Sequence, residues 1–115
     1  GAVSDLEQAF LTRWRQLGYP DIWQREYRPF EVRRFRFDLA VPEPHFVAVE
    51  VDGGTWVQGR HTTGSGYDSD CLKHNLATAA GWRVFRITSS MLRDAPELHL
   101  AMIADALGVK QEEQA

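Results

Sequence analysis

Apolar residues near the start of the chain recur every three or four positions, as they do on one face of an α-helix. They are Leu6, Phe10, Leu11, Trp14 and Leu17. Ser4 and Glu7 stand three residues apart and match a capping box, in which the two side chains satisfy free backbone N–H groups. Gly18 and Pro20 follow the last apolar position and are typical of a helix end. The pattern predicts a first helix that begins at Ser4.

Four later segments have patterns that are typical of β-strands. Residues 33–41 alternate strictly, whereas 46–52 form the most apolar strand. Residues 83–88 predict a third main strand, and 25–32 predict a short additional one. Because successive side chains of a strand point to opposite faces, the segment 33–41 should present two different faces. One face would carry Phe35, Phe37, Leu39 and Val41, and the other Arg34, Arg36, Asp38 and Ala40.

Residues 68–80 and 94–107 predict two further helices, each followed by a glycine of the kind that ends a helix. The connection 53–66 holds five glycines and is unusually long for so small a domain. Since a long crossover precedes the last strand, we expect an α/β fold with a small mixed sheet flanked by helices, whose early strands form a meander. We expect a single domain over 1–108 and a disordered tail over 109–115.

The composition is that of an ordinary folded domain. The chain has 115 residues, of which 43% are hydrophobic and 25% are charged. We find no run of about 18 uncharged apolar residues that would predict a membrane span, and no secretory signal pattern. Cys71 is the single cysteine, so it cannot form an internal disulfide. We therefore expect a reducing, cytoplasmic setting.

The formal net charge is −3, which by itself disfavours binding to nucleic acid. The charges are unevenly distributed, however, because residues 25–36 hold five arginines against two glutamates. Such a basic strip can bind phosphate while the whole molecule stays acidic, although it can equally be a solvated strand face. The chain has no G-x-S-x-G element, no P-loop lysine motif and no zinc-ligand spacing. These absences argue against a serine hydrolase, a nucleotide-binding loop and a zinc site.

Two carboxylates stand on the polar faces of consecutive predicted strands. Asp38 belongs to the first of these strands, and Glu50 lies near the end of the next. Because neighbouring strands lie about 4.8 Å apart, the two side chains could converge on one cation. Mg²⁺ takes oxygen ligands, and the backbone carbonyl of Val51 is a natural third one. In the alternative reading, either acid pairs with a nearby arginine, namely Arg34, Arg36 or Arg83.

Three further residues have both a functional and a structural interpretation. Glu7 lies along the apolar stripe of the first helix, so it is either a helix cap or a metal ligand that faces the sheet. Lys73 could stabilise charge or align an attacking water, or it could form a salt bridge with Asp70. His61, in the glycine-rich connection, is a candidate general acid or base, or a phosphate contact, but most such histidines are simply surface residues.

Four short motifs occur in a characteristic order along the chain. They are Phe37-Asp38, Glu50-Val51-Asp52-Gly53-Gly54, Asp70 followed by Lys73, and Gly81-Trp82-Arg83-Val84-Phe85-Arg86. Together they resemble the PD-(D/E)XK nuclease superfamily over about residues 4–92. The likeness is greatest to the small single-domain branch, which includes very-short-patch repair and phage-type endonucleases; archaeal-type Holliday junction resolvases share the same core. The resemblance implies a restriction-endonuclease-like core.

The resemblance also implies that the protein hydrolyses phosphodiester bonds in DNA with Mg²⁺, for which Mn²⁺ would substitute. Asp38 and Glu50 match the metal ligands of the superfamily, together with the carbonyl of Val51. Glu7 matches an acidic residue that is often found on the first helix. Phe37 stands in place of a proline that many members of the superfamily lack.

Asp52 departs from the motif, because it stands where the superfamily has the lysine that activates water. Lys73 or His61 is then the candidate replacement. The remaining predicted DNA contacts are Arg34, Arg36, Arg60, His61 and Trp56, of which the tryptophan would act as a wedge or a stacking residue unless it belongs to the core.

Two classes of function remain open from the sequence. The first is an endonuclease of the bacterial or phage-infected cytosol that nicks mismatched or duplex DNA, or that resolves Holliday junctions. A resolvase needs two sites on a symmetric junction, and therefore a homodimer. The second is a non-catalytic DNA-binding or assembly domain on a nuclease scaffold, which the missing motif lysine would favour.

Overall fold

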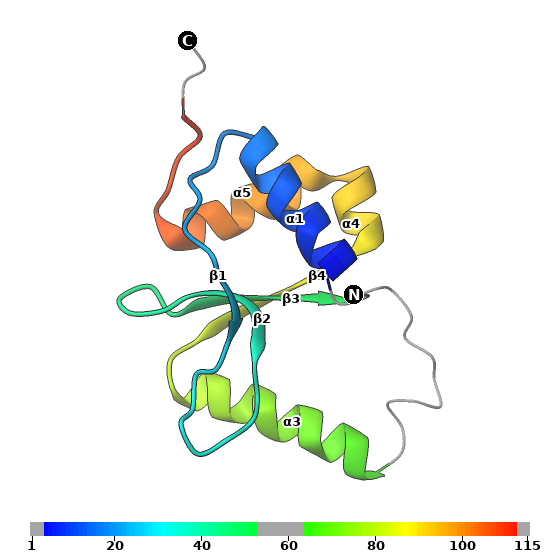
Figure 1. Cartoon of the computed structure of the whole chain (residues 1–115), viewed down its shortest axis with the longest axis vertical. Coiled ribbons are helices and arrows are strands. Elements are labelled where there is room, and N and C mark those ends of the chain that lie inside the picture. Colours follow the sequence, from blue (N-terminus) through cyan, green and yellow to red (C-terminus); the bar gives the residue numbers. More distant parts are fainter. Residues whose placement is uncertain (1–3, 53–63, 113–115) are drawn as a thin grey trace.

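The computed structural model describes residues 4–52 and 64–112. Helices α1, α4 and α5 lie on one face of a sheet, and α3 lies on the other (Figure 1). The elements in chain order are α1 (Ser4–Gln16), β1 (Gln24–Tyr27), β2 (Phe37–Val41), β3 (Val47–Asp52), α3 (Gly64–Ala79), β4 (Arg83–Thr88), α4 (Ser89–Asp94) and α5 (Pro96–Leu107). The predicted α/β class with a small mixed sheet flanked by helices is confirmed.

The sheet has the strand order β1-β2-β3-β4. Strands β1, β2 and β3 form an antiparallel meander, with Leu39 opposite Val49 in the β2–β3 pair. Strand β4 pairs with β3 in parallel, with Glu50 opposite Arg86. The connection from β3 to β4 includes α3, because a parallel pair cannot be joined by a hairpin. The predicted meander and crossover are both present.

The larger core lies between the sheet and helices α1, α4 and α5. The apolar stripe predicted for the first helix supplies Phe10, Leu11 and Trp14, all buried. They pack against Leu39 and Val49 of the sheet. The helices α4 and α5 complete this core with Leu92, Leu100, Ile103, Ala104 and Leu107. The burial of these large side chains is the main stabilising contribution to the fold.

A smaller core lies between the sheet and α3. It contains Phe37, Ala40, Ala48, Ala77 and Trp82. The prediction that Phe37 shares a face with Leu39 and Val41 is wrong, because those two residues belong to the larger core. Regular alternation fails at the start of β2, where Phe37 packs against the ring of Trp82 with centroids 4.9 Å apart. A large aromatic partner on the α3 side therefore decides which way Phe37 points.

Several element boundaries differ from the sequence-based prediction. Strand β2 begins at Phe37 and not at residue 33, and β1 ends at Tyr27. Helix α3 begins at Gly64, within the segment 53–66 that was predicted as a connection. The short helix α4 was not predicted, because six residues hold too few apolar positions to show a helical period. The hydroxyl of Thr88 caps it by accepting a hydrogen bond from the amide of Met91.

The segment after α5 returns to the end of α1. The amide of Glu112 donates to the carbonyl of Gly18 at 2.7 Å, and the side chain of Gln111 donates to the carbonyl of Leu17 at 2.8 Å. Val109 packs against the larger core. Residues 109–112, which the sequence assigned to a disordered tail, are therefore held by specific contacts, and 113–115 lie outside the described residues.

Helix α5 has two exposed apolar side chains besides its buried face. Leu98 is 62% exposed and Met102 is 48% exposed, and the two stand one turn apart.

Among the helices of the described segments, none is long and apolar enough to cross a membrane.

Candidate functional site

Three carboxylates from three different elements meet near the start of β2. Glu7 comes from α1, Glu26 from β1 and Asp38 from β2. One carboxylate oxygen of each lies within 4.8 Å of those of the other two. Such a group of like charges is unfavourable unless a cation or a proton compensates it, and oxygen ligands of this kind suit Mg²⁺ or Ca²⁺. We refer to Glu7, Glu26 and Asp38 as the acidic cluster.

Glu7 is completely buried, which is rare for a carboxylate. Its Oε1 accepts a hydrogen bond from Nε of Arg25 at 2.7 Å. Its Oε2 is also buried but finds no hydrogen-bond donor within the described part of the chain. Of the two interpretations of Glu7, this geometry matches the one in which the side chain faces the sheet. A buried oxygen without a donor costs free energy unless something positive binds it.

Glu26 is the member of the acidic cluster that the sequence analysis missed. The ladder pairs Arg25 with Leu39 and Tyr27 with Phe37, so Glu26 lies opposite Asp38. Its φ of 51° is in the left-handed region, which costs about 1 kcal/mol or more for a residue that is not glycine. The sequence signal was weak, because Glu26 counted only as a charge that balances arginines, and the pairing of β1 with β2 had no predicted register.

Asp38 links the acidic cluster to the end of β3. Its Oδ2 accepts a hydrogen bond from the amide of Val51 at 2.8 Å. Its carboxylate also lies against that of Glu50, through a side-chain hydrogen bond. The structure thus brings together the two acids that the sequence placed on adjacent strands. The backbone of Val51, whose carbonyl was the predicted third ligand, is beside them.

Glu50 and Lys73 form an ion pair between β3 and α3. The ammonium of Lys73 donates to Oε1 of Glu50, and also to the carbonyl of Arg36 at 2.6 Å. Burial raises the pKa of Glu50 to about 7; Lys73 opposes this shift, and Asp38 adds to it. At neutral pH, Glu50 is therefore protonated in part and ionised in part in the metal-free protein. A cation bound beside it would release that proton.

Lys73 lies with its ammonium against the sheet. Its ammonium lies 5.6 Å from the ring centroid of Phe37, and its partners are Glu50 and the carbonyl of Arg36. The helix α3 positions it, since Ala77, one turn further on, is buried in the smaller core. An ammonium held in this way can donate hydrogen bonds to an oxygen on which negative charge develops.

The arginines that the alternative reading paired with Asp38 or Glu50 have other positions. Arg83 donates to the backbone carbonyl of Ala106 at 2.8 Å. Arg34 and Arg36 are exposed on the connection between β1 and β2. The other predicted site residues, Trp56, Arg60 and His61, lie outside the described residues.

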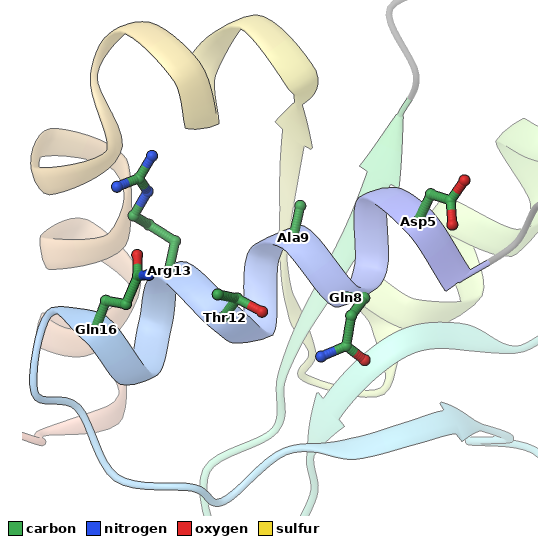
Figure 2. Close-up of a pocket in the computed structure, with 6 residues that line it drawn as sticks. All are labelled: Asp5, Gln8, Ala9, Thr12, Arg13 and Gln16. Carbon is green, nitrogen blue, oxygen red and sulfur yellow. The ribbon is translucent and has the colours of Figure 1, made fainter.

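A shallow hollow on the outer face of α1 is separate from this site. Its volume is about 570 Å³, and Figure 2 shows that its lining residues all come from α1: Asp5, Gln8, Ala9, Thr12, Arg13 and Gln16. It contains none of the predicted site residues.

Comparisons of the chain with protein-family models, curated proteins and solved structures found no match.

Proposed function

We propose that the protein is a Mg²⁺-dependent endonuclease that hydrolyses phosphodiester bonds in DNA. The observation that carries this proposal is the convergence of Glu7, Glu26, Asp38 and Glu50 with the ammonium of Lys73. Carboxylates and an ammonium in one place are the groups that phosphodiester hydrolysis requires. The proposal also rests on the resemblance to the PD-(D/E)XK superfamily and its restriction-endonuclease-like core.

The acidic cluster has the chemistry of a site for a divalent cation. It offers only oxygen ligands, which Mg²⁺ prefers, and Oε2 of Glu7 is buried without a donor. Glu7, Glu26 and Asp38 would hold the cation, and the carbonyl of Val51 and Glu50 would take part from β3. Glu26 thus joins the ligands expected from the sequence. A cation bound there would supply a water of lowered pKa and would offset charge on the scissile phosphate.

The protein's own side chains would position the reacting groups. Lys73 is fixed by Glu50 and by the carbonyl of Arg36, so its third N–H can hold the attacking water or the phosphate oxygen that becomes more negative. In this role it replaces the lysine that the motif lacks at Asp52. Arg25 compensates the charge of Glu7 on the other side of the cluster.

The test is cleavage of labelled DNA in Mg²⁺ or Mn²⁺, with EDTA as the blank. The panel contains a matched duplex, a mismatched duplex, a four-way junction and a single strand. The Asp38→Asn variant keeps the shape of the side chain but removes its charge, and it should lose at least about 10³-fold in cleavage rate. Asp21→Asn, which changes an exposed acid, is the matched control and should cleave like the wild type.

Three results would discriminate among the proposals. Equal cleavage by Asp38→Asn and the wild type would refute the nuclease assignment. Binding to DNA without cleavage of any substrate would favour the non-catalytic DNA-binding domain instead. Preferred cleavage of the junction, together with a dimer in sedimentation at micromolar concentration, would identify a resolvase, whereas a strict monomer would favour a nickase.

A further inference from the structure

The connection between β1 and β2 carries a hollow lined only by arginines. Arg28, Arg34 and Arg36 surround a volume of about 450 Å³. All three residues are exposed, and the connection lies on the α3 side of the sheet (Figure 1). Nη2 of Arg28 donates to the carbonyl of Arg33 at 3.0 Å, which links the start of the connection to its middle. We call this feature the arginine hollow.

The arginine hollow has a local excess of positive charge. None of its three guanidinium groups forms an ion pair with a carboxylate of the described residues. Of the two glutamates near these arginines, Glu26 belongs to the acidic cluster, and Glu31 is exposed and forms no ion pair with them within the described residues. Guanidinium groups around one hollow repel one another, and an anion between them removes that repulsion. Their planar donor pairs match the oxygens of a phosphate.

The hollow is adjacent to the candidate catalytic site. The carbonyl of Arg36 accepts a hydrogen bond from the ammonium of Lys73, which itself pairs with Glu50. Arg36 also precedes Asp38 by two residues. A strand of nucleic acid whose scissile phosphate lay near Asp38 would bring a neighbouring phosphate toward the hollow, because a charge occurs every 3.4 Å along each strand.

We propose that the arginine hollow binds one phosphate group of the nucleic-acid substrate, next to the scissile phosphate. Its role in cleavage rests on the proposed function, whereas its affinity for phosphate does not. The net charge of −3 gives no general attraction to DNA, so binding depends on local sites of this kind. The phosphate is either a backbone diester or a terminal monoester, and both present negatively charged non-bridging oxygens to the arginines.

The test measures binding of fluorescent single-stranded oligonucleotides by anisotropy in EDTA, where no cleavage occurs. The double variant Arg34→Gln/Arg36→Gln should bind at least about tenfold more weakly than the wild type. Its slope of log K against log salt concentration should fall by about 0.7, which corresponds to one phosphate contact on a single strand. Arg13→Gln/Arg15→Gln removes the same charge from α1 and should bind within about twofold of the wild type.

Arg28→Gln extends the test to the third residue that lines the hollow, and it should also weaken binding of the oligonucleotide. Circular dichroism should show that all variants melt within a few degrees of the wild type. Equal losses in the hollow variants and the α1 control would overturn the proposal, because binding would then follow total charge.

A tighter wild-type complex with a 5′-phosphorylated oligonucleotide would identify the terminal monoester as ligand, and equal affinities would identify the backbone diester.

The two proposals can fail separately. If the hollow variants lose binding but the wild type never cleaves DNA in Mg²⁺ or Mn²⁺, the phosphate site stands and the nuclease assignment falls. If the wild type cleaves DNA and the hollow variants bind and cleave as it does, the nuclease assignment stands and the phosphate site is refuted.

Discussion

The two faces of the sheet bury different kinds of side chain. The face under α1, α4 and α5 buries large aromatic and aliphatic side chains, including Phe10, Trp14 and Leu100. The face under α3 buries three alanines with Phe37 and Trp82, and it carries the ion pair of Glu50 and Lys73. The ionic groups are not confined to the α3 face, because Glu7 of the acidic cluster is fully buried on α1.

The largest effect should come from opening a cavity in the well-packed face. Phe10→Ala should lower the free energy of unfolding by about 3–5 kcal/mol, because Phe10 is fully buried against Trp14 and Trp23. Urea denaturation measures the loss. Below the melting temperature, the folded variant should still cleave DNA at the wild-type rate. A selective loss of cleavage with unchanged stability would show that Phe10 also positions Glu7, which lies three residues earlier on the same helix.

Lys73, on the α3 face, should affect the cleavage rate and not the stability. Lys73→Ala should reduce the single-turnover cleavage rate by about 10²–10³-fold, since it removes the ammonium held by Glu50. The matched control is Lys110→Ala, because Lys110 is exposed and is the only other lysine of the chain. If Lys73→Ala keeps the wild-type rate, the role would pass to another residue, with His61 as the first candidate.

The raised pKa of Glu50 predicts a pH dependence of stability in the absence of divalent metal. Because the pKa in the folded state is about 7 and the unfolded value is 4.5, the folded protein binds this proton more tightly. The resulting stabilisation is complete below pH 4.5 and is lost as the pH rises through about 7. Glu50→Gln lacks this dependence.

Between pH 5 and pH 8, the wild type should therefore lose about 2–3 kcal/mol of stability relative to Glu50→Gln. Denaturation in EDTA at several pH values measures the difference. Glu97→Gln, at an exposed position on α5, should follow the wild type. Parallel profiles for Glu50→Gln and the wild type would contradict the prediction.

The smallest effect concerns Glu26, the member of the acidic cluster that only the structure revealed. Glu26→Gln should weaken Mn²⁺ binding about tenfold, because it removes one of three carboxylates from the acidic cluster. Electron paramagnetic resonance of free Mn²⁺ gives the affinity directly. Glu31→Gln, at an exposed position on the connection that follows β1, is the control. An unchanged affinity in Glu26→Gln would leave Glu26 outside the site.

Local pattern alone was enough for most of the secondary structure. The apolar stripe of α1, the apolar run of β3 and the segment 83–88 were predicted close to their observed bounds. The proximity of Asp38 and Glu50 also followed, since consecutive strands of a meander are neighbours.

Tertiary structure decided what depends on partners distant in sequence. Trp82 determines the face of Phe37, and the register of β1 against β2 brings Glu26 to Asp38. Lys73 finds Glu50 because α3 packs across the sheet. Sequence periodicity reports which side of an element is buried. It does not report which residues of two elements face each other, because that depends on register, twist and the shape of the packed core.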